Sequence, residues 1–530
     1  MKDTKKTDDE EINRNLKLIA KSGFFVLFAV FFSKILVYAY RVVIARYYGS
    51  EMYGLFSLAI MISGIVVAIA LFGLVEGILR FVPIYRGLKQ ERDTDYLLKS
   101  INKVVLISSL FAGILLFFLS GVIAERIFHN ANLAIFLKIF SLLIPISVFS
   151  DVYIATIRAY EKIGWHSFLS YVFHNIIKIL MLGLFVYLGI RGENAIAYSY
   201  LLGILGSLIL AYFVVKKVVP RITRNEKGKL NLEKRRDIRK GLFSYSLPLL
   251  FSSIISLIFH WIDSFSLGFL KGAIEVGWYN AAIPIAALLS IAPELFIKLF
   301  FPIINREYSK KNIKIIEELS KQVTKWIFII NLPLMVLLIL FPGAALNILF
   351  GKEYLAAETA LRLLALGGLI SSMFSIIPYR LISMTGRSKT LLINITIFGI
   401  VNVVLNFLLI PMEKIWFIEN SMGLNGAAIA TLISISLSSL LLTLQSRKYL
   451  SIVPLRRKMI LIFASGAVAA FALFYVKKFV EINIYSLIVL SAFFVLSYIA
   501  IIFLTKGLDK NDLMIIRYFK SKIEINDKDT

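Results

Sequence analysis

The sequence predicts an all-α integral membrane protein, and three observations support this prediction. The chain has 530 residues, of which 58% are hydrophobic and only 17% charged, whereas a typical soluble domain is about 45–50% apolar and about 25% charged. The apolar residues gather in long runs of the length that a helix needs to cross a bilayer. No run alternates polar and apolar residues as a membrane β-strand does. A soluble enzyme, a disordered scaffold and a secreted disulfide protein are therefore excluded.

Residue counts exclude further classes of protein. The chain has no cysteine, so it has no disulfide, no thiolate chemistry and no cysteine-based metal site. Its four histidines lack the spacing of metal ligands, and we expect no metal site. The net charge of +26 comes from bases that are scattered between apolar runs, which argues against a nucleic-acid partner.

Apolar runs bounded by charged residues predict fourteen membrane-spanning helices. The first run is too long for the apolar core of a cleavable signal peptide, so we expect it to be retained. The predicted spans are 23–45, 53–82, 101–123, 133–157, 164–189, 195–215, 243–269, 278–304, 326–349, 355–384, 391–410, 422–444, 459–476 and 484–505.

The distribution of lysine and arginine predicts the orientation of the chain. The two termini and the loops on their side of the membrane hold 43 of the 59 bases, and the loops on the other side hold eight. Basic residues are enriched in cytoplasmic loops. We therefore predict a multi-pass protein of the cell membrane with both termini in the cytoplasm.

Labelling of introduced cysteines tests this orientation, because the natural chain has no cysteine. A cysteine at Lys229 is expected to react with an impermeant reagent only from the cytoplasmic side, and one at Lys352 only from the outside. Reaction of both sites from one side would contradict the predicted topology.

The spans and the basic loops suggest six segments. The longest basic loop lies within residues 216–242 and carries eleven lysines and arginines. Contact with anionic lipid headgroups best explains this concentration of positive charge. The predicted segments are a cytoplasmic N-terminal segment (1–22), an N-lobe of spans 1–6 (23–215), a basic cytoplasmic linker (216–242), a C-lobe of spans 7–12 (243–445), spans 13 and 14 (446–505) and a cytoplasmic C-terminal tail (506–530).

A short internal echo suggests that the two lobes are repeats. Glu51 and Gly54 open the second span, and Glu275 and Gly277 open the eighth, each followed by aromatic residues and alanine. Both lobes begin at the cytoplasmic face, so the repeat must be parallel, with its axis along the membrane normal.

Further short motifs follow one another along the chain. They are Arg41–Gly49, Tyr53–Phe56, Leu71–Gly77, Asp263, Leu267–Gly268, Val276–Ala282, Gly386–Arg387, Asn394, Asn402, Asn406, Leu409–Pro411 and Gly423–Thr431. With these motifs and its predicted spans, the chain resembles the multidrug/oligosaccharidyl-lipid/polysaccharide (MOP) exporter superfamily over nearly its whole length. Within that superfamily it is most similar to the polysaccharide-transporter branch.

The resemblance implies a pair of six-helix lobes in a V shape, with spans 13 and 14 as peripheral helices. It also implies a flippase that moves a polyprenyl- or dolichyl-(pyro)phosphate-linked oligosaccharide from the cytoplasmic to the outer leaflet by alternating access. The partners are then this lipid-linked oligosaccharide and anionic lipids, and we expect a monomer that is not an enzyme. No cofactor is implied. Without a Walker A sequence, Na⁺, H⁺ or the membrane potential would supply the energy.

Two other functions remain open at this stage. One is a cation-coupled multidrug exporter of the same superfamily, although such exporters normally have twelve spans and an acidic first lobe. The other is a membrane-embedded polysaccharide polymerase, which needs a sizeable catalytic loop, whereas the external loops here have about ten residues or fewer.

Charged residues inside the spans are the candidate functional residues, since an ionised side chain at the bilayer centre costs at least ~2.5 kcal/mol. Lys34 and Arg41 lie seven residues apart on one face of the first predicted helix. Two such bases repel each other unless an anion lies between them. We predict that they bind substrate phosphate, for which the arginine fork is suited; a structural ion pair is the alternative.

Two more bases of the first lobe complete the predicted substrate site. Lys178 lies near the middle of the fifth span, four residues after His174. Arg80 lies near the cytoplasmic end of the second span, four residues after Glu76. This acid-then-base spacing favours mutual neutralisation on one helix, and Arg80 as a substrate residue is the alternative.

Asp263 and Glu76 are the candidates for ion coupling or for a gate between the lobes. Asp263 has no basic neighbour within its own predicted helix. Aligning Gly54 with Gly277 matches Arg41 to position 264, so the first lobe carries a base almost where the second carries an acid. A fixed structural salt bridge is the alternative.

Spans 13 and 14 contain no charged residue. A helix that is apolar on all sides has no face suited to a hydrated pathway. We predict that both pack on the outside of the bundle beside lipid.

Overall fold

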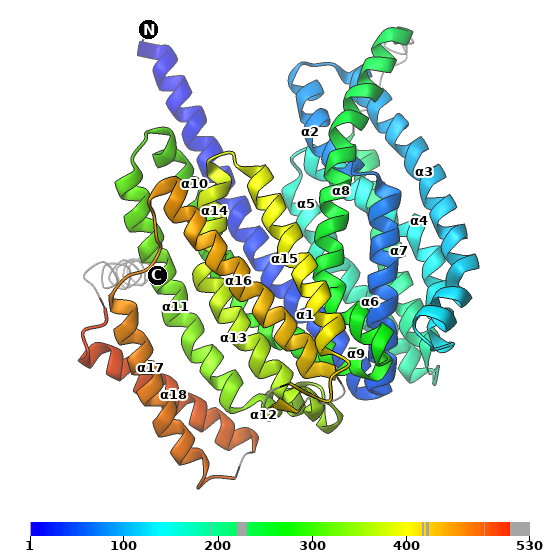
Figure 1. Cartoon of the computed structure of the whole chain (residues 1–530). Helices are drawn as coiled ribbons and strands as arrows, with labels where there is room; N and C mark the ends of the chain where they lie inside the picture. Colours follow the sequence, from blue (N-terminus) through cyan, green and yellow to red (C-terminus); the bar gives the residue numbers. More distant parts are fainter. Residues whose placement is uncertain are drawn as a thin grey trace, which may run out of the picture. The chain divides into compact units, whose positions relative to one another are not determined.

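Figure 1 shows the fold of the chain as a computed structural model. It describes residues 2–190, 192–219, 230–415, 418–419, 423–481 and 483–508, and only the backbone of residues 2–31, 299 and 484. The N-terminal side chains, most of the C-terminal tail and the central part of the basic linker, including Lys229, lie outside this description. In the described part the protein is almost entirely helical. A two-residue antiparallel pair, β1 (Lys414–Ile415) with β2 (Ile418–Glu419), is an addition to the predicted all-α fold.

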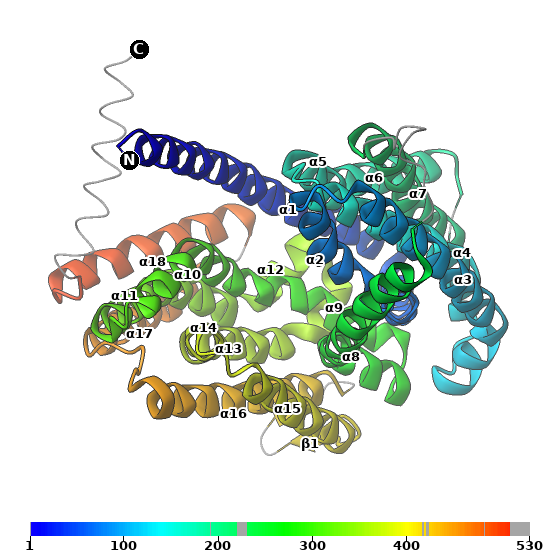
Figure 2. The ribbon, with the colours of Figure 1, turned by 90° about the horizontal axis from the view of Figure 1, so that it is seen from above.

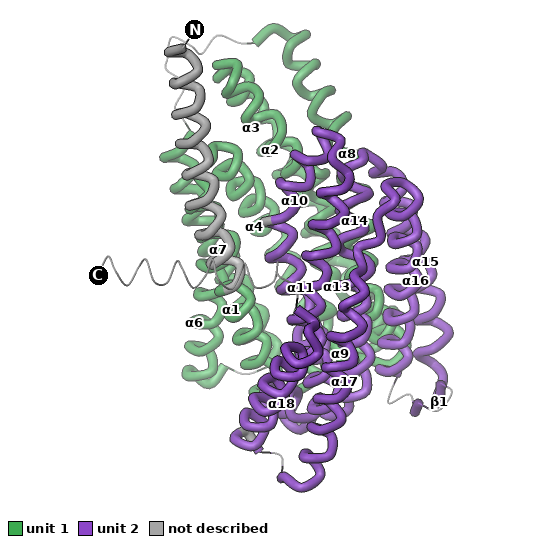
Figure 3. The backbone as a smooth tube through the Cα atoms, turned by 90° about the vertical axis from the view of Figure 1, so that its left-hand side faces the viewer, with its two compact units in different colours: residues 1–280 green, residues 281–530 purple. Residues whose placement is uncertain are grey.

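The chain divides into two compact units, residues 1–280 and residues 281–530 (Figure 3). This division differs from the predicted boundary within the linker 216–242. The physical reason is that the seventh predicted span, α8 (Leu232–Leu270), packs on α1, α2 and α3 of the first unit. The V-shaped pairing of two lobes stays a prediction.

The first unit is built around α4, which packs on α1, α2, α3 and α7. Its position follows from its sequence, because most residues of α4 are apolar and it buries Phe136, Leu143 and Val148. The helices of this unit are α1 (Lys2–Leu71), α2 (Leu74–Gly87), α3 (Glu91–Val122) with a π-helical turn η1 (Ile123–Ile127), α4 (Asn132–Ala159), α5 (Ile163–Ser167), η2 (Phe168–Phe173), α6 (His174–Tyr187), α7 (Glu193–Val218), α8 and the start of α9 (Ala273–Ala286).

Thirteen helices of the described residues are long and apolar enough to cross a membrane, against the fourteen that were predicted. The difference arises in α1, which runs through the first predicted span and most of the second. Gly49 interrupts the helical geometry there, with φ 85° and ψ 178°, a conformation that glycine adopts without a steric penalty. The fourteen-span count is therefore not confirmed as a number of separate helices.

The two glycines of the internal echo contact each other where α1 crosses α9. A Cβ on Gly54 would collide with the Ala273 carbonyl, and a Cβ on Gly277 would collide with the Ser50 carbonyl. Gly277 lies 223 residues after Gly54, and Ala273 lies 223 residues after Ser50. The two contacts are therefore equivalent under the alignment of the internal echo, and the crossing is symmetric. Glycine is required at both positions because only its missing side chain lets the two backbones approach.

The second unit packs α11 on α10 and α13, and α16 on α13 and α15. Its helices are η4 (Ala287–Ser290), α10 (Ile291–Ser309), α11 (Ile313–Leu340), α12 (Pro342–Leu349), η5 (Lys352–Ala357), α13 (Glu358–Phe374), α14 (Ile376–Met384), α15 (Ser388–Leu409), α16 (Leu424–Leu450), α17 (Lys458–Lys477) and α18 (Ile484–Leu504).

The last two helices, α17 and α18, pack on each other and on α11 (Figure 2). Gly466 of α17 allows this contact, since a Cβ there would meet the Leu332 side chain at 2.7 Å. Large apolar side chains on both helices are exposed, including Phe471 at 66% and Leu496 at 67%. Exposed apolar residues of this size suit a lipid-facing surface, as predicted for spans 13 and 14.

Polar side chains within the membrane join α15 to α16. The amides of Asn394 and Gln445 exchange two hydrogen bonds of 2.7 and 3.2 Å. Asn402 donates to the Thr431 hydroxyl at 3.2 Å. Such bonds between helices fix their register where water cannot compete, which gives these motif residues a structural role.

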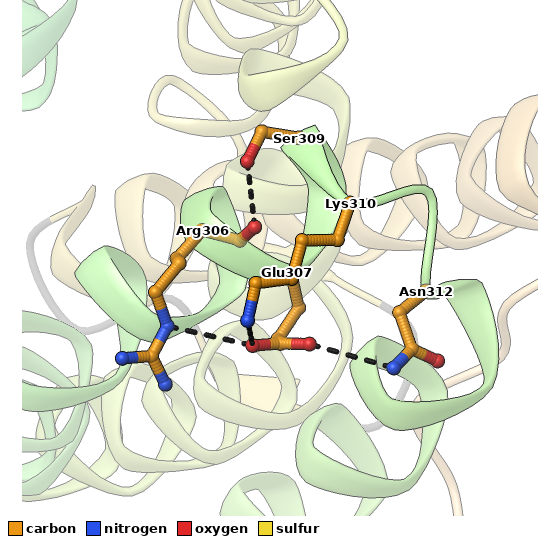
Figure 4. A network of polar contacts seen from close by, with 5 residues as sticks. All are labelled: Arg306, Glu307, Ser309, Lys310 and Asn312. Carbon is orange, nitrogen blue, oxygen red and sulfur yellow. Dashed lines mark hydrogen bonds and ion pairs between the residues drawn. The ribbon is translucent and has the colours of Figure 1, made fainter.

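The turn from α10 to α11 is held by Glu307, outside the apolar spans (Figure 4). One carboxylate oxygen accepts from Lys310 Nζ at 3.2 Å and from Arg306 Nε at 3.4 Å, and the other accepts from Asn312 Nδ2 at 3.4 Å. The hydrogen bond from Lys310, together with the charges of Lys310 and Arg306, lowers the pKa of Glu307.

This lowered pKa predicts a pH-dependent stability effect of Glu307→Gln. The ionised carboxylate is favoured in the folded state, so its contribution is present above the ordinary carboxyl pKa and lost as the pH falls through the lowered one. Glu307→Gln is expected to lower the melting temperature slightly at neutral pH and to have no effect in acid. Melting curves over a pH series check this, and an equal deficit at every pH would contradict it.

Candidate functional site

Arg41 is the first residue of the candidate site, and the local fold of α1 positions it. Arg41 is half-buried and donates a hydrogen bond to the Tyr53 hydroxyl, which in turn donates to the backbone carbonyl of Asn280 at 3.1 Å. Tyr53 is fully buried. Tyr53 is thereby fixed beside Arg41, whose guanidinium carries five N–H donors.

Lys178 is the second residue, and it is almost fully buried within α6 at 5% exposure. Its ammonium nitrogen lies over the ring of Tyr200 from α7, 3.8 Å from the ring centre. Gly203 of α7 makes room for the lysine stem, since a Cβ there would collide with the Lys178 side chain. A cation over an aromatic face is stabilised by the ring quadrupole, and more strongly when it is desolvated.

A cluster of aromatic rings supports Tyr200. Its ring lies 5.5 Å from that of Phe140, 5.6 Å from that of Phe56 and 6.4 Å from that of Tyr40, between ring centres. Tyr40 is fixed by its hydroxyl, which donates to the Ile196 carbonyl at 3.2 Å and lies 2.9 Å from the Ser199 hydroxyl. The platform for Lys178 is therefore rigid.

Arg41 lies within electrostatic range of Lys178 and of Tyr200. That the two cations hold one phosphate between them stays a prediction. No described carboxylate forms an ion pair with Lys178. Two cations held close together at membrane depth are stabilised by an anion between them, and a phosphate could use the arginine fork and the lysine charge together.

Lys34 and Arg80 are placed less centrally than predicted. Lys34 is half-buried on the same helix as Arg41, about 10 Å away along the axis from the rise of a helix. Arg80 lies over the ring of Tyr245 from α8, with its guanidinium carbon 4.2 Å from the ring centre. No contact joins Arg80 to Arg41 or Lys178 among the described residues, so the structure supports a two-cation centre more directly than a four-cation one.

The predicted ion pair between Glu76 and Arg80 is wrong. Both side chains are exposed, and no ion pair joins them in the structure. The stacking of Arg80 on Tyr245 explains this, because contact with α8 draws the guanidinium away from the helix that carries Glu76. Glu76 instead lines a cavity between α2, α4 and α8.

Asp263, the candidate coupling or gate residue, lies on α8 and contacts α9. Asp263 accepts a hydrogen bond of 2.8 Å from the Tyr279 hydroxyl. His260, one turn earlier on α8, is within electrostatic reach of both Asp263 and Arg41. A role of Asp263 as a gate or coupling residue stays a prediction.

Sequence reasoning missed Tyr200. A tyrosine in an apolar run has no distinguishing pattern, and its function here comes from packing against α6. The weak signal available was the pair Lys178 and Gly203, since a glycine in a membrane helix often marks the close approach of a neighbouring side chain.

Comparisons with known proteins agree with this architecture. The family model described as polysaccharide biosynthesis protein matches residues 19–307, more than half of the chain, and the MatE family model matches residues 248–408. The chain is 26% identical to a protein assigned as an O-antigen transporter of Shigella flexneri, over 75% of this chain and 90% of that one. It is 27% identical to a protein assigned as the flippase AglR of Haloferax volcanii, over 48% of this chain and 56% of that one.

A solved structure shares the fold. The lipid II flippase MurJ, in an inward closed conformation, matches with a TM-score of 0.66 at 19% identity, over 90% of this chain and 98% of that one. At this identity the likeness concerns the fold alone.

Proposed function

We propose, from the premise that the chain belongs to the polysaccharide biosynthesis protein family of the MOP superfamily, that it is a flippase for a phosphate-bearing glycolipid. The substrate is a polyprenyl- or dolichyl-(pyro)phosphate-linked oligosaccharide, which moves from the cytoplasmic to the outer leaflet by alternating access. Names of relatives support the transport of a lipid-linked glycan.

The observation that carries the proposal is Lys178, a buried cation that lies over the Tyr200 ring, with Arg41 of the same unit within electrostatic range of both residues. A lipid-linked saccharide carries its negative charge at the phosphate, between the tail and the first sugar. A fixed pair of cations at membrane depth offers that phosphate a partner which lipid tails cannot. A cationic drug would be repelled at the same place, so the pair argues against the multidrug alternative.

Reconstitution in proteoliposomes tests the function. A fluorescent polyprenyl-diphosphate oligosaccharide is placed in the outer leaflet, and a membrane-impermeant reductant measures how much of it has moved to the inner leaflet. Vesicles with the protein are expected to protect a larger fraction of the dye from the reductant than empty vesicles do, because flipping carries part of it to the inner leaflet. Equal traces with and without protein, together with uptake of a cationic dye, would overturn the proposal in favour of drug export.

A further inference from the structure

Two adjoining cavities of the first unit begin beside Lys178. The first measures about 320 Å³ between α1, α4, η2, α6 and α7, and it is lined by Tyr200, whose ring lies under the Lys178 ammonium. The second measures about 340 Å³ between α1, α2, α4, α5, η2 and α8, and Glu76 lines it. We call them the Tyr200 cavity and the Glu76 cavity.

Asp151 of α4 joins the two cavities, because it lines both, as does Ser170 of η2. The Glu76 cavity continues to Arg158 and His166, beside the turn between α4 and α5 that the predicted topology puts on the cytoplasmic side. A glycan whose phosphate lies at Lys178 would therefore extend through the Tyr200 cavity first and the Glu76 cavity next.

Hydroxyl groups without protein partners line the Tyr200 cavity. Ser63 and Ser207 are buried, at 3% and 1% exposure, and neither hydroxyl has a hydrogen-bond partner. His174 directs Nδ1 to the Leu169 carbonyl at 3.0 Å, which leaves Nε2 as an acceptor in the neutral tautomer. Buried polar groups of native proteins normally have partners. The cavity thus suits a ligand that both donates and accepts hydrogen bonds, as sugar hydroxyls do.

Two carboxylates give this route its charge. Glu76 and Asp151 are exposed where they line the cavities, and neither forms a hydrogen bond or ion pair with any residue that the structure describes. Arg158, at the cytoplasmic end, is the one lysine or arginine that lines either cavity in the described part of the chain. An ionised carboxylate accepts hydrogen bonds but cannot donate them, and its bonds from hydroxyl groups are stronger than those between neutral groups.

The same carboxylates oppose an anionic ligand. A uronic acid has a carboxylate, ionised at neutral pH, where the corresponding hexose has a CH₂OH group. Beside Glu76 or Asp151 the uronate would meet a like charge in surroundings of low dielectric constant, whereas the hexose hydroxyl donates a hydrogen bond. A site that is built to receive hydroxyl donors rejects a ligand that lacks them.

We propose that the two cavities hold the first two sugars of the glycan, and that Asp151 and Glu76 select sugars without a negative charge. Pockets of about 300–1,000 Å³ take small-molecule ligands, so each cavity has the size for a sugar ring. The sugar next to the phosphate lies beside Asp151, and the following one lies beside Glu76. This inference rests on the proposed function and narrows its substrate class to glycans that begin with neutral or amino sugars.

Equilibrium binding of lipid-linked disaccharides to the purified full chain tests the inference. Four lipids share one polyprenyl chain and one phosphate: the bare polyprenyl phosphate, its diglucose form, and two forms with glucuronic acid as the first or as the second sugar. The wild type is expected to bind the diglucose lipid at least about tenfold more tightly than either glucuronic acid lipid, because like charges placed together suppress binding.

Single variants assign each carboxylate to one sugar. Asp151→Asn is expected to relax the discrimination against glucuronic acid as the first sugar, and Glu76→Gln to relax it only at the second. Glu125→Gln is the control, since Glu125 is exposed in η1 and lines neither cavity, and it keeps the wild-type preference. Equal affinity of all these proteins for bare polyprenyl phosphate shows that the fold and the phosphate site are intact.

Equal affinity of the wild type for the three glycolipids, or tighter binding of a glucuronic acid lipid, would overturn the sugar site. An undiminished preference in the double variant Glu76→Gln with Asp151→Asn would overturn it as well. In each of these cases binding of the bare polyprenyl phosphate leaves the proposed function standing. Absence of binding by every lipid would overturn the proposed function, and this inference with it.

Discussion

Arg41→Ala is expected to reduce flipping of a lipid-linked oligosaccharide by about 100-fold, which corresponds to about 2.7 kcal/mol at 1.36 kcal/mol per tenfold. The physical reason is the loss of charge-assisted hydrogen bonds to phosphate at a site whose other cation, Lys178, cannot replace them. Arg41→Lys is expected to recover only part of the activity, since lysine keeps the charge and loses the bidentate fork. Initial flipping rates in proteoliposomes measure the effect.

A matched control shows whether the loss of any positive charge reduces transport, or only the loss of the charge at Arg41. Arg126 is exposed near the end of α3, away from the candidate site, and Arg126→Ala is expected to flip at the wild-type rate. Melting temperatures of both variants should stay near that of the wild type. Full transport by Arg41→Ala would remove this residue from the mechanism.

Gly277→Leu is expected to have the largest effect on stability, a loss of about 3 kcal/mol or more in the free energy of unfolding. Any side chain at this position meets the Ser50 carbonyl, which belongs to a helix backbone and cannot move alone. A leucine must separate α1 from α9 or unfold their crossing. The loss of monodisperse protein on heating in detergent gives the melting temperature that checks this.

Gly64→Ala is the control, because Gly64 lies on the same helix α1 and a Cβ there has open space around it. In a helix interior alanine is favoured over glycine by about 0.5–1 kcal/mol, so this variant is expected to melt at or slightly above the wild-type temperature. Wild-type stability of Gly277→Leu would show that the two helices do not depend on their close crossing.

Much of the fold could be predicted from the sequence, because long apolar runs in a membrane protein have few alternatives to helix. The glycines of the internal echo were interpreted only as a sign of repeats, and the structure shows that they also permit a close backbone crossing. Arg41 and Lys178 stood out for a similar reason: a charge within an apolar run is costly, so its presence signals a partner or a ligand.

Features that depend on tertiary contacts could not be predicted. The spacing of Glu76 and Arg80 predicts an ion pair on one helix, yet a tyrosine on α8 draws the arginine away. The division of the chain near residue 280 follows from the packing of α8, which no local pattern encodes.

The measurement that tests the central account most directly is the affinity of the purified protein for a polyprenyl phosphate compared with the polyprenol of the same length. The two ligands differ only in the phosphate. We expect the phosphate form to bind at least tenfold more tightly to the wild type, and Arg41→Ala with Lys178→Met to abolish the difference. Equal affinity of the wild type for both ligands, or an unchanged preference in the double variant, would contradict the assignment of this cation pair as the phosphate site.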